Sequence, residues 1–282
     1  MIKIISDSTC DLTKELLEEY DISILPLHVM LGEKDLLDGV TVTPDEIYEW
    51  ADANKTTPKT SAPSIEDAID LIKPYVENGD NVIYFSISKE MSTSINVINL
   101  AVDELEANDK VFVIDSGNLS TGVGHLVLEA ATMVKEGMDV KDIVAKIEEL
   151  KPRVRASFVV DTLTYLHRGG RCGSVAALAG GVLKLHPKIV VEDGKMGATK
   201  KYRGKMDSVI LSYAKEMEEE YRNAKTDRIF ITHSGCDEKI IESVSSYLRE
   251  LDIFKEIIVT RAGSVISSHC GYGTLGILYI AK

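Results

Sequence analysis

The sequence predicts an α/β protein built from two α/β domains with mainly parallel sheets. Short apolar, β-branched segments alternate with longer segments of helical period, the pattern of strands covered by helices. With 282 residues, 44% of them apolar, the chain can form one large core or two of ordinary size. The predicted strands cover residues 2–6, 22–30, 81–86, 110–115, 156–160, 188–192, 228–232, 256–260 and 277–280.

Two predicted helices have clear N-terminal signals. Thr43 precedes Pro44 and stands three residues before Glu46, which predicts a capping box with proline in the first turn. Ser64 stands three residues before Asp67 and predicts a second helix start of the same kind. Residues 139–150 and 206–224 are amphipathic and charged, so we expect helices with one face on a core and the other in water.

The predicted domain boundary lies between residues 153 and 154. The helical pattern stops at residues 151–153, and the strand at 156–160 begins a second series of elements. An N-terminal α/β domain is therefore expected at 1–153 and a C-terminal α/β domain at 154–282. Asp193-Gly194 predicts a hairpin turn, so the second domain is not expected to be purely parallel.

Composition limits the classes of partner. The net charge is −13, from 32 basic and 45 acidic side chains, so a broad basic surface for nucleic acid or anionic lipid is not expected. The sequence has no apolar segment of the roughly 18 residues that span a bilayer. The four cysteines lack C-x-x-C spacing and the histidines are scattered, which predicts no metal site and a reduced, cytoplasmic environment.

Clusters of small hydroxyl residues and glycine follow predicted strands or precede predicted helices. They cover residues 6–9, 59–64, 86–94 and 115–124. Hydroxyl groups and free backbone N–H groups at helix starts bind carboxylate or phosphate oxygens, and open sheets collect ligands at strand ends. These clusters predict an anion site, with the alternative that each one only caps its own helix.

Two further segments carry positive charge. Gly169-Gly170 permits a tight turn before Arg171, which can place a guanidinium over an anion, and a helix-like apolar segment then runs to about residue 185. The alternative is a turn with an exposed arginine. Residues 200–205, which include Arg203 and Lys205, concentrate basic charge in an acidic chain and predict either a docking patch or a solvated hairpin end.

The C-terminal segment spells Gly271-x-Gly273-x-x-Gly276, the form of a dinucleotide-binding fingerprint. That fingerprint needs a following helix and an acidic residue about 20 positions on. Only six residues follow Gly276, and they read as a closing strand, so the match is accidental. Instead, we expect Gly271 and Gly273 to turn the backbone tightly beside a ligand headgroup.

His269-Cys270 is the one adjacent pair of imidazole and thiol. In an extended segment adjacent side chains point to opposite faces, so they are poorly placed to act on each other. We expect His269 to donate a hydrogen bond to an anion, with a structural core histidine as the alternative. A second functional class stays open, in which Cys270 or Ser92 is the nucleophile of a hydrolase or transferase acting on a small acyl or phosphorylated substrate.

Taken in order, the motifs of this sequence resemble those of the DegV family over residues 4–279. The segments that carry the resemblance are Ser6-Asp7-Ser8-Thr9-Cys10-Asp11-Leu12, Thr60-Ser61-Ala62-Pro63-Ser64, Ser86-x-Ser88-x-x-Met91-Ser92, Asp115-Ser116, Gly169-Gly170-Arg171 and His269-x-Gly271-x-Gly273. Each motif is weak alone, but together and in register they are specific.

The resemblance implies a fold and a function. It implies a long-chain fatty acid buried between two α/β domains, with no other cofactor, and a protein that is itself not an enzyme. It would present the fatty acid carboxylate to a separate ATP-dependent fatty acid kinase catalytic subunit, and the acyl phosphate would feed phospholipid synthesis.

The resemblance also implies roles for individual residues. Thr60 and Ser92 match the carboxylate ligands, with Ser61 and Thr93 as neighbouring candidates, and His269 matches the histidine beside the headgroup. Basic positions near the mouth of the site, for phosphate or for kinase docking, are matched by Arg171, Arg203 and Lys205.

Three positions depart from the pattern of the family. Thr93 stands where glycine is usual, Cys172 where an aliphatic residue is common, and Tyr272 where proline is common. A side chain at position 93 is expected to crowd a backbone that approaches the ligand closely. The geometry around the headgroup is therefore expected to differ, although the predicted fold is unaffected.

Overall fold

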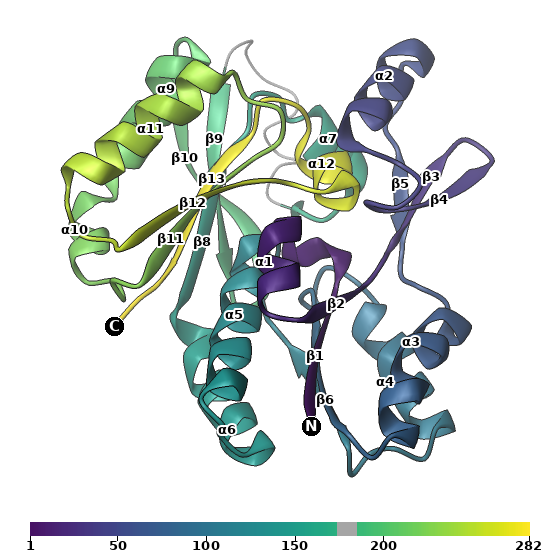
Figure 1. The fold of residues 1–282 in the computed structure, drawn as a ribbon. Coiled ribbons are helices and arrows are strands. Elements are labelled where there is room, and N and C mark those ends of the chain that lie inside the picture. Colours follow the sequence, from purple (N-terminus) through teal and green to yellow (C-terminus); the bar gives the residue numbers. More distant parts are fainter. Residues whose placement is uncertain (174–184) are drawn as a thin grey trace.

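The computed structural model describes residues 1–173 and 185–282 and confirms the α/β class (Figure 1). The predicted apolar segment at 174–184 lies outside the described residues. Six helices among the described residues do not belong to the groups of helices described below with each sheet. They are η1 (Ser8–Cys10), α1 (Lys14–Glu19), α2 (Pro44–Asn54), η2 (Lys151–Arg153), α7 (Thr164–Gly169) and α12 (Ser264–Cys270).

The first sheet is parallel and has the strand order β2-β1-β6-β7. Its strands are β1 (Ile2–Asp7), β2 (Ile22–Leu25), β6 (Asn81–Ser86) and β7 (Val111–Asp115). Alternate residues of β1 and β6 face opposite sides, as the strand period requires. Ile4 and Phe85 pack towards helices α5 (Thr121–Lys135) and α6 (Val140–Leu150), whereas Ile5 and Tyr84 pack towards α3 (Ile65–Glu77) and α4 (Ser94–Glu104).

The second sheet is mixed and has the order β10-β9-β8-β13-β11-β12. Its strands are β8 (Val154–Val159), β9 (Leu185–Glu192), β10 (Lys195–Arg203), β11 (Arg228–His233), β12 (Glu256–Arg261) and β13 (Leu275–Ile280). Of its recorded pairs, β11 with β12 is parallel and the others are antiparallel. The expectation of mainly parallel sheets thus describes the first sheet only. In the second sheet, the β9–β10 hairpin and the closing strand β13, which lies between β8 and β11, make most of the strand pairs antiparallel.

The predicted strand at 22–30 is two strands, because Pro26 has no N–H group to donate to a ladder. After Pro26 the chain leaves the first sheet and forms β3 (His28–Leu31). With β4 (Lys34–Leu37) and β5 (Lys59–Ser61), β3 forms a small antiparallel sheet that was not expected from the sequence. Figure 1 shows this sheet beside α2 and apart from the two larger sheets.

The predicted helix starts are confirmed. Both capping boxes form: the Thr43 hydroxyl accepts from the Glu46 N–H at 3.4 Å, and the Ser64 hydroxyl accepts from the Asp67 N–H at 3.0 Å. The predicted helix at 206–224 is divided at Met217 into α9 (Met206–Glu216) and α10 (Glu218–Arg222). These helices lie with α11 (Glu238–Glu250) over the outer face of the mixed sheet (Figure 1).

Helix α5 joins the two larger sheets into one packed body. It contacts β1 and β6 of the parallel sheet and also β8 and β13 of the mixed sheet. Its buried His125 donates from Nε2 to the Leu278 carbonyl of β13, at 3.0 Å. The first strand of the mixed sheet begins at Val154, next to the predicted boundary. One hydrophobic cluster contains residues of both sheets, so the division into two domains at residue 153 stays a prediction.

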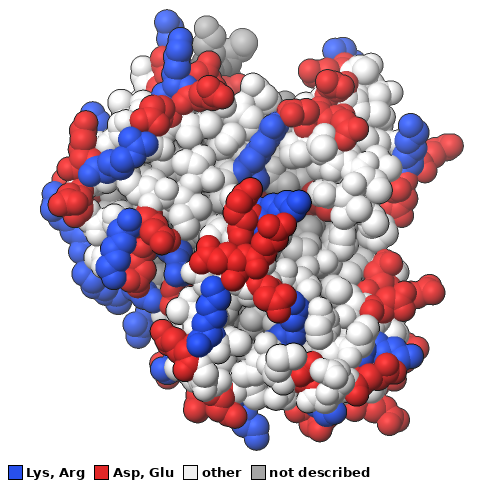
Figure 2. Space-filling view, in the orientation of Figure 1, with Lys and Arg blue, Asp and Glu red and all other residues white. Residues whose placement is uncertain are grey.

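The surface carries both signs of charge. On the face drawn in Figure 2, Lys and Arg side chains are interspersed with Asp and Glu. Acidic side chains gather near the middle of this face, where Figure 1 places α1, a helix that carries Glu15, Glu18 and Glu19. Among the described residues, none of the helices is both long and apolar enough to cross a bilayer.

Candidate functional site: a cavity between the sheets

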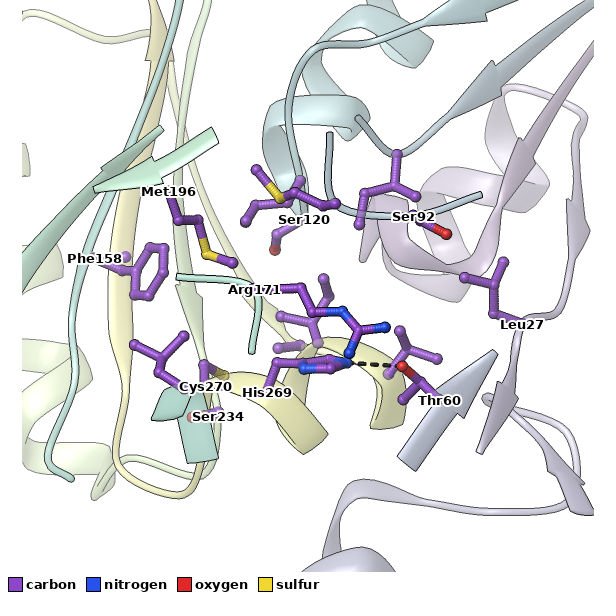
Figure 3. Close-up of a pocket in the computed structure, with 18 of the residues that line it drawn as sticks. Leu27, Thr60, Ser92, Ser120, Phe158, Arg171, Met196, Ser234, His269 and Cys270 are labelled. Carbon is purple, nitrogen blue, oxygen red and sulfur yellow. Dashed lines mark hydrogen bonds between the residues drawn. The ribbon is translucent and has the colours of Figure 1, made fainter. Parts of the chain in front are cut away.

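A cavity of about 470 Å³ lies where β5, the loops after β6 and β7, strand β8 and helix α12 meet (Figure 3). This volume is within the range of about 300–1,000 Å³ typical of small-molecule sites. Its polar lining includes Thr60, Ser61, Ser92, Thr93, Ser120, Arg171 and His269, and its apolar lining includes Leu27, Ile87, Leu119, Phe158, Met196, Val265 and Leu278. The cavity therefore combines a polar region with a larger apolar wall.

Thr60 and His269 meet across the cavity although 209 positions separate them. Thr60 is on β5, opposite Val29 of β3, and His269 is near the end of α12. Thr60 Oγ1 and His269 Nε2 are 2.7 Å apart. Burial, with the positive charge of Arg171 as a second cause, lowers the pKa of His269 to about 4. The imidazole is therefore neutral at physiological pH.

Gly169 and Arg171 complete this side of the cavity. A side chain at Gly169 would lie 2.5 Å from His269 Nδ1, so glycine is needed for space rather than for a turn. The turn itself is at Gly170, which has φ +68° and ends α7. The exposed Arg171 donates from Nη1 to the Gly169 carbonyl at 2.6 Å, and its guanidinium extends towards Thr60 (Figure 3).

Ser92 and Thr93 lie in the loop between β6 and α4. The Ser92 hydroxyl accepts from the Ser94 N–H at 3.2 Å and lies 2.8 Å from the Ser94 hydroxyl. Thr93 has φ −87° and ψ 5°, in the bridge region, where φ is negative and glycine is not required. The structure thus brings Thr60, Ser61, Ser92, Thr93, Arg171 and His269 to one cavity.

Other predicted site residues lie elsewhere. Arg203 is at the opposite end of β10 from the cavity residue Met196, about 20 Å along the strand, and Lys205 precedes α9. Gly271 and Gly273 do turn the backbone, with φ +78° and +79°, but they are not among the cavity residues. The space they leave is occupied by the side chains of Tyr165 and Asp161, respectively.

The expectation that His269 and Cys270 lie in an extended segment is wrong. They form the last residues of α12, and both line the cavity. Burial raises the pKa of the Cys270 thiol to about 12, so it is protonated at physiological pH and a poor nucleophile. The recorded partner of the Ser92 hydroxyl is Ser94, not an imidazole or carboxylate, within the described chain. Neither candidate nucleophile is activated.

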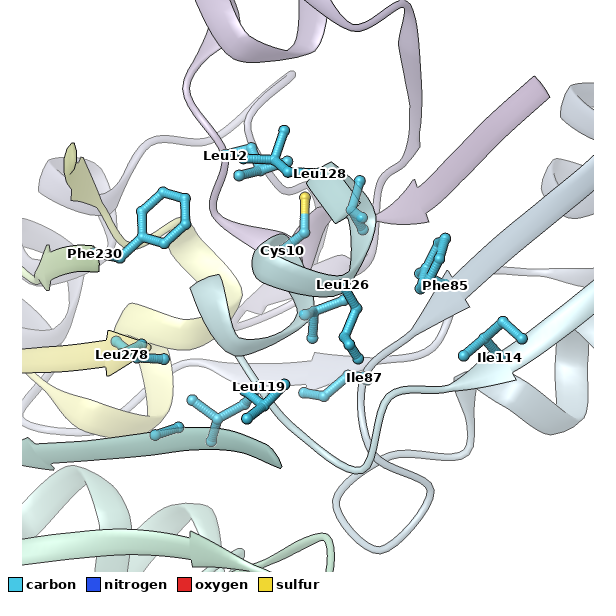
Figure 4. Packing of buried hydrophobic residues seen from close by; sticks show 14 of the residues in the cluster. Cys10, Leu12, Phe85, Ile87, Ile114, Leu119, Leu126, Leu128, Phe230 and Leu278 are labelled. Carbon is cyan, nitrogen blue, oxygen red and sulfur yellow. The ribbon is translucent and has the colours of Figure 1, made fainter. Parts of the chain in front are cut away.

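The residues that form the apolar wall were not predicted from the sequence. Ile87, Leu119 and Leu278 line the cavity and also belong to the hydrophobic cluster around α5 (Figure 4). Their sequence environments are those of ordinary core positions, so no local signal separates a residue that contacts a ligand from one that contacts another side chain. In the part of the chain that the structure describes, no group of three or more His, Cys, Asp or Glu could hold a metal ion.

Known proteins share the whole of this architecture. The model of a family described as "Uncharacterised protein, DegV family" matches residues 1–282. A DegV domain-containing protein of Clostridium perfringens is 32% identical over 100% of this chain and 99% of its own.

Two solved structures share the same fold. A DegV family protein of Thermus thermophilus, described by its fatty acid binding, has a TM-score of 0.91 at 30% identity, with coverage of 100% and 99%. A stearic acid-binding protein of Eubacterium ventriosum has a TM-score of 0.87 at 32% identity, with the same coverage. The chain therefore belongs to the DegV family.

Proposed function

We propose that this protein binds one long-chain fatty acid, with the carboxylate among Thr60, Ser92, Arg171 and His269 and the acyl chain along the apolar wall. The observation that carries the proposal is that one cavity joins these polar groups to Phe158, Met196 and Leu278. The fatty acid binding described for the relatives from Thermus thermophilus and Eubacterium ventriosum supports it.

The hydrogen bonds of His269 favour this orientation. Its buried Nδ1 has no partner among the described residues, and a buried N–H without an acceptor is rarer than a buried acceptor without a donor. The proton is therefore assigned to Nε2, which donates to Thr60 Oγ1. The Thr60 hydroxyl is then free to donate to a ligand carboxylate, and Arg171 supplies a positive charge beside it.

The apolar wall supplies most of the binding free energy in this proposal. Each methylene transferred from water contributes about 0.8 kcal/mol, so an acyl chain gains more from the wall than a carboxylate gains from a few hydroxyl groups. The hydroxyl groups instead fix which end of the ligand lies at Thr60.

We extend the proposal to phosphorylation by a separate ATP-dependent kinase catalytic subunit in the cytoplasm. A carboxylate oxygen would attack the γ-phosphorus of ATP, forming the acyl phosphate and releasing ADP. The resemblance of the motifs supports this role, and so does the absence of an activated Cys270 or Ser92 in the described cavity. Because acyl phosphates react with hydroxylamine, acyl hydroxamate should appear only when a host-cell extract and ATP are both added to the loaded protein.

The binding function is tested by comparing the native mass of the untreated protein with mass spectrometry of its organic extract. We expect a near-stoichiometric long-chain fatty acid in the extract and the matching mass in the native spectrum. A clean extract, together with no gain of mass when oleate or palmitate is added, would contradict the proposal and favour an enzyme acting on a small acyl or phosphorylated substrate.

A further inference from the structure

The start of α12 is held by two buried carboxylates from the N-terminal half of the chain. The Gly263 N–H donates to Asp11 Oδ1 at 2.8 Å, and the Ser264 N–H donates to Asp38 Oδ1 at 2.6 Å. Asp11 is 6% exposed and Asp38 is 3% exposed. Gly263, the residue before the helix, has no side chain to cap it, so distant carboxylates take the place of a local cap.

The second oxygen of each carboxylate is bound within the N-terminal half. Asp11 Oδ2 accepts from the Ser120 hydroxyl at 2.5 Å, and Asp38 Oδ2 accepts from the Ser8 hydroxyl at 2.8 Å. A buried carboxylate is costly unless donors surround it, and here each one bridges two segments. Burial raises the pKa of both carboxyl groups against the opposing effect of these hydrogen bonds.

Gly263 provides the space for this arrangement. Its φ of −64° is accessible to any residue, so glycine is not needed for its conformation. A Cβ atom there would lie 3.1 Å from both oxygens of Asp38 and 3.3 Å from Asp11 Oδ1. Such contacts are tighter than ordinary van der Waals contact, so a side chain at this position would push the two carboxylates away from the helix.

Both carboxylates hold elements that line the cavity. Helix α12 begins at Ser264 and carries His269 at its other end. Ser120, which Asp11 binds, lines the cavity and has φ +52° and ψ −143°, a backbone conformation that is strained for a residue with a side chain. The hydrogen bond from the Ser120 hydroxyl to Asp11 helps to offset that strain.

We propose that Asp11 and Asp38 are positioning residues for the fatty acid site, which hold α12 so that His269 reaches Thr60. This inference rests on the proposed function. The hydrogen bonds that cap the first N–H groups of α12 also attach the helix to the N-terminal half of the chain. Loss of either carboxylate therefore frees the helix to move relative to β5. The distance between His269 and Thr60 then ceases to be fixed, and the headgroup site is formed for only part of the time.

The test combines Asp38→Ala, Asp11→Ala and Gly263→Ala with Asp237→Ala as the matched control. Asp237 caps α11 by accepting from the Lys239 N–H at 2.8 Å and does not itself line the cavity. All four variants are expected to have lower melting temperatures. Oleate affinity, measured well below the unfolding transition, is expected to fall about tenfold in the first three and to be unchanged in Asp237→Ala.

Imidazole nitrogen NMR supplies a readout that a general loss of stability would not change. The His269 signals, assigned by their loss in His269→Gln, should shift in Asp38→Ala and not in Asp237→Ala. Asp38→Asn should restore both affinity and shifts in large part, because an amide oxygen can still accept from the Ser264 N–H. If Asp11→Ala or Asp38→Ala does not fold, the comparison of Gly263→Ala, which should lose affinity, with Asp38→Asn, which should largely keep it, still tests the proposal.

Two outcomes would overturn the inference. One is that the Asp11 and Asp38 variants have lower melting temperatures but unchanged oleate affinity and unchanged His269 signals. The two carboxylates would then stabilise the start of α12 without positioning the site. The other is an equal loss of affinity in Asp237→Ala. Failure of the proposed function has a separate signature, since the wild-type protein would then not bind oleate at all.

Discussion

The two sides of the cavity are built in different ways. The side at Thr60 is formed by short polar loops and a three-residue strand, and its ligand-facing groups are hydroxyls, an imidazole and a guanidinium. The side at Phe158 is formed by long strands of the mixed sheet and continues into the hydrophobic core. Under the proposed function, the polar side selects the headgroup and its orientation, whereas the apolar side supplies affinity in proportion to chain length.

The largest effect is expected at the polar side. Thr60→Ala removes the hydroxyl donor and leaves His269 Nε2 without its partner, so affinities for both oleate and decanoate should fall by the same factor, about a hundredfold. Isothermal titration measures both constants, and Thr60→Ser is the control that keeps the hydroxyl. A loss that grew with chain length would contradict the assignment of Thr60 to the headgroup.

Much of the polar side could be predicted from the sequence, since hydroxyl and glycine residues cluster in turn motifs that are specific in combination. Thr60, Ser92 and His269 were found in this way. The apolar side could not, because Phe158 and Met196 look like core residues until the sheets are assembled. The β3–β5 sheet was missed because its strands are short, and the pairing of Asp38 with Ser264 spans 226 positions that no local pattern connects.

The second effect concerns the titration of His269. Its pKa in the folded protein, about 4, is below the unfolded value near 6.5, so its contribution to stability is present above about pH 6.5 and is lost as pH falls towards 4. At about 1.36 kcal/mol per unit, the loss at about pH 5 is about 2 kcal/mol. Other buried histidines, such as His125, contribute a loss in the same pH range, and they do so in both proteins. Urea unfolding at about pH 7 and about pH 5 should therefore show a loss that is larger in the wild type than in His269→Gln by about 2 kcal/mol. Equal losses would show that His269 is not buried in its neutral form.

A smaller effect is expected at the apolar side. Met196→Gln places an amide on the apolar wall at a half-buried position, so oleate affinity should fall about tenfold. Decanoate, if its chain ends before this residue, should keep its affinity. The same titrations as for Thr60→Ala measure the contrast, and equal losses for the two acids would remove the distinction between the two sides.

The smallest effect is expected from thiol modification. Cys270 lines the cavity, but burial holds its thiol in the protonated form, so iodoacetamide should leave the oleate content of the loaded protein unchanged. Native mass spectrometry before and after treatment gives the result. Rapid alkylation of Cys270 accompanied by loss of an acyl-transfer or hydrolytic activity would instead support the enzyme alternative.

The orientation of the ligand is the central claim, and a crystal structure of the protein with oleate tests it most directly. We expect the carboxylate within hydrogen-bond distance of Thr60 Oγ1 and the acyl chain passing Phe158 and Met196. A carboxylate at the Phe158 end of the cavity, or an oleate bound outside it, would contradict the proposed orientation.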